Sequence, residues 1–225
     1  CKGYLVRDDN MKPLYMIGCI NEIGERQKAD NVSGLLGESG FREYMNQLDT
    51  PLETGYLLRI GIDHFKEIND NFGQEYGDFV LKKTAECISG CTSEGQKVYK
   101  LVADEFLILD VASDEAKDAD KLYDKVREAI DRFIETNEFK VMYTVSGGIV
   151  PFAALKGNQC SEALKLTDFA LNEAKKLGRN RCYIFNGETY RKFLRKREIT
   201  QELREAVING FQGFTAFYQP VFAED

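Results

Sequence analysis

The pattern of apolar and polar positions changes between strand-like and helix-like segments from residue 30 onward. Apolar stretches of strand length cover residues 56–62, 96–101, 106–109, 141–150 and 181–185. Segments with a helical period cover residues 40–48, 65–71, 75–89, 115–135 and 161–177. The segment 115–135 places five apolar side chains on one face, namely Ala119, Leu122, Val126, Ile130 and Phe133. This order of helices and strands predicts an α+β fold.

The two ends of the chain follow different patterns. Residues 3–7 and 14–20 predict a strand hairpin, and 21–29 a charged linker. Because a hairpin alone is marginally stable, we expect this one to complete a sheet or to pack on another domain. Residues 188–208 predict a charged helix without a core of its own, and 215–221 an unfinished strand element. We therefore expect the chain to be the middle of a longer protein.

Composition and charge narrow the class of protein. The 225 residues are 43% hydrophobic and 30% charged, as in soluble globular proteins. A net charge of -7 argues against nonspecific binding to nucleic acid or to an anionic membrane. No apolar run approaches the ~18–20 residues that span a bilayer, and no signal peptide is visible. Six cysteines without a CxxC pair, beside a single histidine (His64), predict reduced thiols in a cytoplasmic protein and no Cys/His metal cluster.

The strongest sign of chemistry is the pair Asp104–Glu105 between two strand-like segments. Adjacent carboxylates at a hairpin tip repel each other unless a cation or a proton offsets their charge. The pair therefore indicates a metal-dependent site. Val102 and Ala103 stand at the tip, where such turns favour glycine. Because a β-branched residue at positive φ is strained, we expect the tip to be reshaped.

Five motifs occur in one order and spacing that point to a known family. They are RIGIDHFKEIND (59–70), FGQEYGD (72–78), KLVADEF (100–106), VSGGI (145–149) and TDFALNEAKKLGRNR (167–181). Together they resemble the GGDEF family of bacterial diguanylate cyclases over residues 29–187, and DNVSGL (30–35) resembles the opening turn of that family. The resemblance implies a mostly antiparallel five-stranded sheet wrapped by helices. It also implies a homodimer that condenses two GTP into cyclic di-GMP with Mg²⁺ or Mn²⁺, in a cleft beside residues 102–105.

The flanking residues resemble parts of other signalling domains. Residues 1–28 resemble the last hairpin of a PAS sensor domain and its linker. Residues 188–225, with FYQPV at 217–221, resemble the first helix and strand of an EAL phosphodiesterase domain.

The resemblance assigns roles to five polar residues. Asn69 and Asp78 match the positions that bind guanine. Lys66, Lys175 and Arg179 match the positions that hold the phosphates. The residues alone leave other roles open: Asn69 and Asp78 as helix caps, and Lys175 and Arg179 as charges that complement a helix dipole.

The catalytic positions are incomplete. In the family, the metal is bound at the position of Asp104, at the backbone carbonyl of Ile62, and at an aspartate whose place is taken here by Gly61. Asp63 matches a residue that supports the loop, and Asp104 and Glu105 are the remnant of the catalytic pair.

Other family positions also differ. Lys100 replaces an arginine and Gln74 a histidine, and Ser93 and Gln96 stand in place of the R-x-x-D motif of product inhibition.

Three functions follow from the resemblance. The first, which we favour, is a degenerate, non-cyclising GGDEF module that regulates an adjacent EAL phosphodiesterase through helix 188–208, either by binding GTP as an effector or as a dimerisation and relay unit. The second is an active cyclase that uses Asp104, Glu105 and the carbonyl of Ile62. The third is a dimerisation spacer without nucleotide. If position 61 and the tip are the main defects, Gly61→Asp combined with Val102→Gly and Ala103→Gly restores metal affinity.

Overall fold

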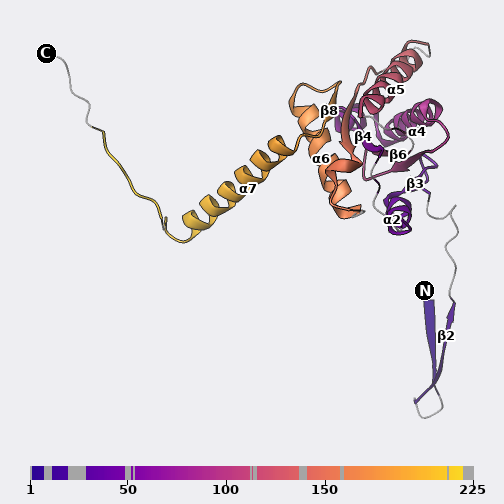
Figure 1. Ribbon diagram of the computed structural model, residues 1–225. Coiled ribbons are helices and arrows are strands. Elements are labelled where there is room, and N and C mark those ends of the chain that lie inside the picture. Colours follow the sequence, from indigo (N-terminus) through magenta and orange to yellow (C-terminus); the bar gives the residue numbers. More distant parts are fainter. Residues whose placement is uncertain are drawn as a thin grey trace. The chain divides into compact units, whose positions relative to one another are not determined.

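A computed structural model describes residues 2–7, 12–19, 29–48, 52, 54–111, 113, 116–136, 141–157, 160–211 and 213–219. The chain divides into two units, Cys1–Ile184 and Phe185–Asp225, which are described one at a time (Figure 1).

A mixed sheet forms the centre of the first unit. Its strands, in spatial order, are β3 (Leu36–Gly37), β5 (Gln96–Lys100), β6 (Glu105–Asp110), β4 (Tyr56–Ile62), β7 (Val145–Pro151) and β8 (Cys182–Ile184). The four inner strands pair antiparallel, and the two edge strands pair parallel to their neighbours. The α+β class and the mostly antiparallel sheet are confirmed. The sheet has six strands instead of five, because the two-residue β3 adds to the edge of β5.

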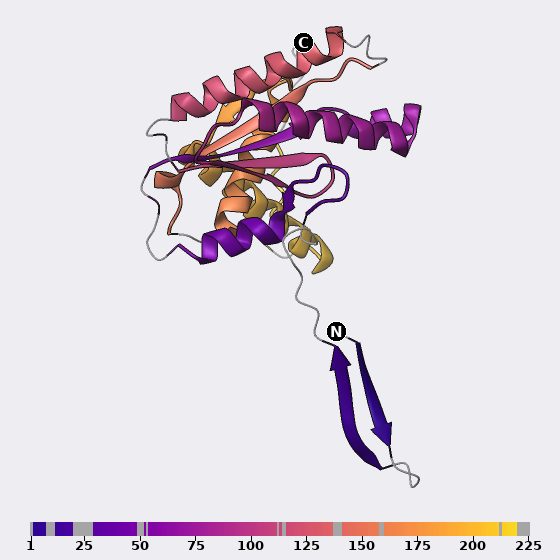
Figure 2. The same ribbon diagram turned by 90° about the vertical axis from the view of Figure 1, so that its right-hand side faces the viewer.

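Helices cover both faces of this sheet (Figure 2). They are α2 (Glu38–Asn46), α3 (Phe65–Phe72), α4 (Gln74–Cys91), α5 (Ala116–Thr136) and α6 (Cys160–Lys176), with a short 3-10 turn at Phe152–Ala154. Helices α4 and α5 lie on one face, and α2 and α6 lie on the other. The face predicted for α5 is buried, with Ala119, Val126 and Ile130 at most 1% exposed. No helix of the described residues is both long and apolar enough to cross a membrane.

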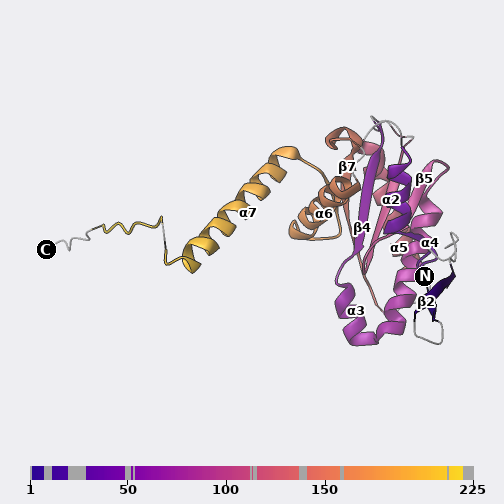
Figure 3. The ribbon, with the colours of Figure 1, turned by 90° about the horizontal axis from the view of Figure 1, so that it is seen from below.

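Strand β4 runs through the middle of the sheet, and the chain continues from its end into α3 (Figure 3). All of its side chains except Arg59 are buried. Because side chains alternate along a strand, Leu58 and Ile60 face α4 and α5, whereas Arg59 and Gly61 face α6. The sequence of β4 thus directs position 61 toward the helix that carries Lys175.

Two glycines of β7 let helices approach the sheet closely. A Cβ atom added at Gly148 would lie 2.3 Å from the backbone nitrogen of Leu171 in α6. One added at Gly147 would lie 2.8 Å from the Tyr123 ring of α5. Since these neighbours are backbone and a packed ring, the SGG motif is a packing requirement that holds α5 and α6 in place.

The strand predicted over residues 141–150 is shorter than expected. Residues 141–144 are not part of β7, because the partner strand β4 ends where Ile62 pairs with Val145. Before the sheet, β1 (Lys2–Arg7) and β2 (Pro13–Cys19) form the predicted antiparallel hairpin. The predicted linker, apart from Ala29, lies outside the described residues.

Four cysteines of the described side chains are free thiols: Cys87, Cys91, Cys160 and Cys182. Burial raises the pKa of all four, and that of Cys87 reaches about 11. Cys160 is buried and the other three are half-buried, so these side chains pack at or near the core.

The second unit consists of α7 (Gly187–Ile208) and a segment without regular structure. The side chain of Asn186 caps the helix by accepting hydrogen bonds from the backbone nitrogens of Glu188 and Thr189. No residue of α7 is buried, which agrees with a charged helix that has no core of its own. The strand expected from Thr215 is wrong over residues 215–219, because a strand needs a ladder partner and the described part of this unit provides none.

Candidate functional site

The hairpin between β5 and β6 closes without glycine at its tip. The backbone nitrogen of Leu101 donates to the carbonyl of Glu105 at 2.9 Å, and that of Glu105 to the carbonyl of Val102 at 3.3 Å. Ala103 takes the left-handed conformation, with φ 55°, while Val102 keeps a negative φ. The reshaped tip therefore moves the strained position from the β-branched residue to alanine.

The side chain of Lys100 stabilises this tip through hydrogen bonds to its backbone. Its side chain is buried, and its ammonium donates hydrogen bonds to the carbonyl oxygens of Leu101 (2.9 Å) and Ala103. Burial lowers the pKa of Lys100, and the nearby Asp30, Asp104 and Glu105 oppose that shift. The sequence marked Lys100 only as a substitution, whereas the structure gives it a supporting role.

Glu105 is paired with cations of the protein itself. Its carboxylate accepts hydrogen bonds from Arg59, at 2.7 Å from Nε and also from Nη2. Lys175 Nζ lies 3.9 Å from the other oxygen. The same guanidinium donates to the carbonyl of Leu164 in α6 and lies 3.5 Å from Asp168. Sequence reasoning missed Arg59, although a lone basic residue within an apolar strand was a usable signal.

Asp104 lies beside the end of β4, as its predicted role requires. Its backbone carbonyl accepts a hydrogen bond from the nitrogen of Ile62 at 3.3 Å. Burial raises the pKa of the Asp104 carboxyl, while the Lys175 ammonium is the strongest influence in the opposite direction. The two residues expected to bind metal are thus adjacent, with a lysine close to them.

Lys175 extends into the space beside Gly61. The β4–β6 register places Gly61 directly opposite Glu105. A Cβ atom added at Gly61 would lie 3.1 Å from Lys175 Nζ, 3.2 Å from Leu171 Cδ2 and 3.5 Å from Glu105 Cγ. The position that carries an aspartate in related domains therefore borders an ammonium group here.

This donor set does not fit a divalent metal ion. Hard cations take several oxygen ligands, mostly carboxylates. Here Glu105 is bonded to Arg59, and Gly61 contributes no side-chain oxygen. No group of three or more His, Cys, Asp or Glu side chains that could hold a metal occurs among the described residues.

Asp63 joins three segments at the edge of the site. Its buried carboxylate accepts hydrogen bonds from Thr144 Oγ1 (2.7 Å), Ser146 Oγ (2.7 Å) and the backbone nitrogen of Asn180 (3.2 Å). These contacts are those of a loop-supporting residue, as the sequence predicts.

Asn69 and Asp78 lie within helices, not at their caps, so the alternative role as caps is wrong. A Cβ atom added at Gly77 would lie 1.8 Å from Asn69 Oδ1, so the Asn69 amide rests against α4 one residue before Asp78. No described residue forms a hydrogen bond or ion pair with the side chain of Asn69 or Asp78. Both polar groups are available to a ligand.

The basic residues lie on separate elements. Lys66 is exposed in the first turn of α3, and Lys175 is in the last turn of α6, where it also complements the helix dipole. Arg179 follows α6 with φ 62°, after Gly178 with φ 117° has ended that helix. Within the described part of the chain, the side chains of Lys66 and Arg179 form no ion pair or hydrogen bond.

Ser93 and Gln96, which replace the product-inhibition motif, stabilise the turn before β5. Gln96 Oε1 accepts from the nitrogen of Ser93 at 2.9 Å, and its amide donates to Asp110 at 2.6 Å.

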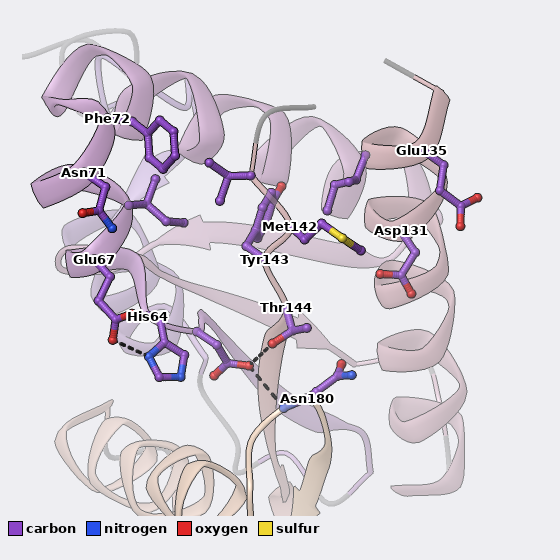
Figure 4. Close-up of a pocket in the computed structure, with 14 residues that line it drawn as sticks. His64, Glu67, Asn71, Phe72, Asp131, Glu135, Met142, Tyr143, Thr144 and Asn180 are labelled. Carbon is purple, nitrogen blue, oxygen red and sulfur yellow. Dashed lines mark hydrogen bonds and ion pairs between the residues drawn. The ribbon is translucent and has the colours of Figure 1, made fainter. Parts of the chain in front are cut away.

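A cavity of about 640 Å³ lies on the other side of Asp63, between α3, the end of α5 and residues 141–144 (Figure 4). Acidic side chains line it, including Glu67, Asp131 and Glu135, and His64 Nδ1 lies 2.7 Å from Glu67. None of the residues predicted to bind nucleotide or metal lines this cavity.

Comparisons with known proteins agree with the fold. Residues 28–181 match the family described as diguanylate cyclase, GGDEF domain. A cyclic di-GMP phosphodiesterase of Pseudomonas aeruginosa, NbdA, is 28% identical over 199 residues, which cover 86% of this chain and 25% of the relative. The diguanylate cyclase DgcZ of Escherichia coli is 30% identical over 161 residues, or 70% of this chain and 53% of the relative. The chain thus spans from a quarter to about half of these relatives.

Two solved structures show the same architecture. The GGDEF domain of PA1120 (TpbB or YfiN) from Pseudomonas aeruginosa superposes with a TM-score of 0.65 at 24% identity, and covers 74% of this chain and 99% of that one. An EAL/GGDEF domain protein from M. capsulatus has a TM-score of 0.54 at 28% identity, and covers 65% of this chain and 94% of that one.

Proposed function

Because the chain belongs to the family of diguanylate cyclase GGDEF domains, we propose that it is a GTP-binding, non-cyclising module that regulates an adjacent EAL phosphodiesterase domain. One contrast carries this proposal. Four of the five nucleotide positions, Lys66, Asn69, Asp78 and Arg179, have side chains without a partner among the described residues, whereas Glu105 of the acid pair is bonded to Arg59 and paired with Lys175. A site of this kind keeps the groups that recognise a ligand and has lost the groups that act on it.

The chemistry of four side chains supports binding of a guanine nucleotide. A carboxamide and a carboxylate offer the donors and acceptors that match the edges of guanine, and Asn69 and Asp78 supply one of each. Lys66 and Arg179 supply cations for the phosphates, and the amino end of α3 adds backbone N–H groups beside them.

The loss of cyclisation follows from the acid pair. GGDEF domains generally use Mg²⁺ or Mn²⁺ with GTP, and the metal supports deprotonation of the attacking hydroxyl. In this chain the position opposite Glu105 is Gly61, and Arg59 already neutralises Glu105. The carboxylates that would hold the ion are too few.

Regulation of a phosphodiesterase is supported by the relatives. NbdA is a cyclic di-GMP phosphodiesterase that matches this chain over 199 residues, and the M. capsulatus protein combines EAL and GGDEF domains. We propose that residues 1–28 end a PAS domain and that 188–225 begin the EAL domain. Coupling then requires that GTP favours one arrangement of α7 over another. GGDEF domains often dimerise, and we expect this one to pair with a second copy.

The test is calorimetric titration of the chain with GTP and with ATP. We expect GTP to bind and ATP not to bind. Asn69→Ala should lower the affinity for GTP about tenfold, the effect of one lost hydrogen bond. Asn71→Ala is the matched control, because Asn71 is on the same helix but lines the separate cavity.

Two results would contradict the proposal. If GTP produces no heat and no thermal shift at millimolar concentration, the domain is a spacer without nucleotide. If cyclic di-GMP accumulates during incubation with GTP and Mg²⁺ or Mn²⁺, the domain is an active cyclase. In a longer chain with the phosphodiesterase domain, GTP should change the rate of cyclic di-GMP hydrolysis, and Asn69→Ala should remove that response.

A further inference from the structure

Lys175 has a position that its role as a phosphate-binding residue does not explain. Its Nζ lies 3.9 Å from Glu105 Oε1 and 3.1 Å from the place where a side chain at position 61 would begin. The side chain is only 25% exposed, so the ammonium is directed toward the strands and away from bulk water. Leu171, one helical turn earlier in α6, also borders the space beside Gly61.

The protein's own cations compensate the acid pair next to this ammonium. Asp104 and Glu105 carry two negative charges at the hairpin tip, and Arg59, Lys175 and the buried Lys100 place positive charges next to them. A divalent ion added here would meet an ammonium within a few ångströms and would find one carboxylate already bonded to Arg59. The missing aspartate at position 61 and the Lys175 ammonium that borders the freed space therefore exclude metal together.

We propose that the Lys175 ammonium takes the place of a divalent cation in this site, so that the domain binds GTP without metal. This inference rests on the proposed function for the identity of the nucleotide. The triphosphate would meet a cation that the protein itself carries, on a helix held against the sheet by the close contact of Gly148 with Leu171. Nucleotide occupancy would then not depend on the concentration of divalent ions.

The first experiment compares titrations with GTP in EDTA and in excess Mg²⁺. The wild-type affinities should agree within about twofold. Gly61→Asp adds a carboxylate beside Lys175 and opposite Glu105, so its binding in EDTA should be at least ~10-fold weaker than in Mg²⁺. Lys175→Gln should weaken binding in EDTA about tenfold. Gly90→Asp makes the same chemical change at an exposed site with nothing near it, and should behave like the wild type.

The second experiment uses Mn²⁺ alone, followed by the electron paramagnetic resonance of the free ion. We expect the wild type to have no Mn²⁺ site at Asp104, so that the wild type and Asp104→Asn bind the same amount of Mn²⁺. The double variant Gly61→Asp, Lys175→Gln should gain such a site. Far-ultraviolet circular dichroism confirms that each variant is folded.

The outcomes separate this inference from the proposed function. If the wild type binds GTP only with Mg²⁺, the inference is overturned and the proposed function stands. If GTP does not bind under any condition, the proposed function fails. The Mn²⁺ measurement then decides whether the Lys175 ammonium takes the place of a divalent ion. Mn²⁺ bound by the wild type and lost in Asp104→Asn overturns it; a site present only in the double variant supports it.

Discussion

The acid pair Asp104–Glu105 acquires its meaning from residues distant in sequence. Adjacent carboxylates at a hairpin tip predicted a cation, and the structure supplies two from the protein, Arg59 and Lys175. The prediction of a partner was sound, but its identity depended on the β4–β6 register and on the contact of α6 with β4. Spacing along the chain does not contain that information.

The geometry changes our expectation for restoring the metal site. The sequence suggested Gly61→Asp with two glycines at the tip. Since Lys175 Nζ borders position 61, we now expect the lysine, more than the tip, to limit metal affinity.

Asp63 allows a test of the loop support at this scale. Asp63→Ala leaves two hydroxyls and one backbone N–H without their acceptor in a buried place, so we expect the free energy of unfolding to fall by about 3 kcal/mol. Urea denaturation measures this. Asp70→Ala removes the same group from an exposed position on α3 and should change stability by less than ~0.5 kcal/mol. Equal stability of the two variants would contradict the supporting role of Asp63.

At the scale of elements, the hydrophobic pattern was sufficient for every long helix and central strand. It was insufficient where a partner decides the structure. Strand β3 has two residues, too few to show a period, and it exists because β5 pairs with it. Residues 141–144 and 215–219 have strand-like composition but pair with no neighbouring strand among the described residues, and so form no strand.

Helix α4 contains two glycines that differ in the space available for a side chain. At Gly77 an added Cβ would displace the Asn69 amide, whereas at Gly90 it would meet nothing within 4 Å. We expect Gly77→Ala to lower the affinity for GTP about tenfold through loss of the Asn69 contact.

Gly90→Ala is the control for this change. It should leave GTP binding unchanged and raise stability by about 0.5–1 kcal/mol through its helix propensity. Calorimetry with GTP and thermal denaturation give both quantities. If Gly77→Ala binds GTP as the wild type does, Asn69 does not recognise the nucleotide from its present position.

At the scale of the whole molecule, the two units differ in how their elements are stabilised. Strand β4 pairs on both sides and is covered on both faces. Helix α7 has no buried residue, although its 22 residues make it as long as the 21-residue α5.

Hydrogen exchange followed by mass spectrometry should reveal this difference. Amides of β4 should exchange only through global unfolding, and those of α7 at least ~100-fold faster. Helix α5 is the control of nearly equal length, because its apolar face is buried and should protect it. Comparable protection of α5 and α7 would mean that α7 is covered by a partner in solution, such as a second copy of the chain.

The hydrogen bonds of Lys100 to the hairpin backbone have a consequence for how the sequences of such domains can change. Its ammonium bonds to main-chain carbonyl oxygens, which every amino acid possesses. The turn is therefore held without regard to the side chain of Val102, which is 73% exposed. The paired glycines at positions 102 and 103 can therefore be replaced while the loop keeps its conformation. A sequence search for those two glycines misses family members of this kind. In this chain the loop is recognised instead by the buried basic residue before the turn and by the acids after it.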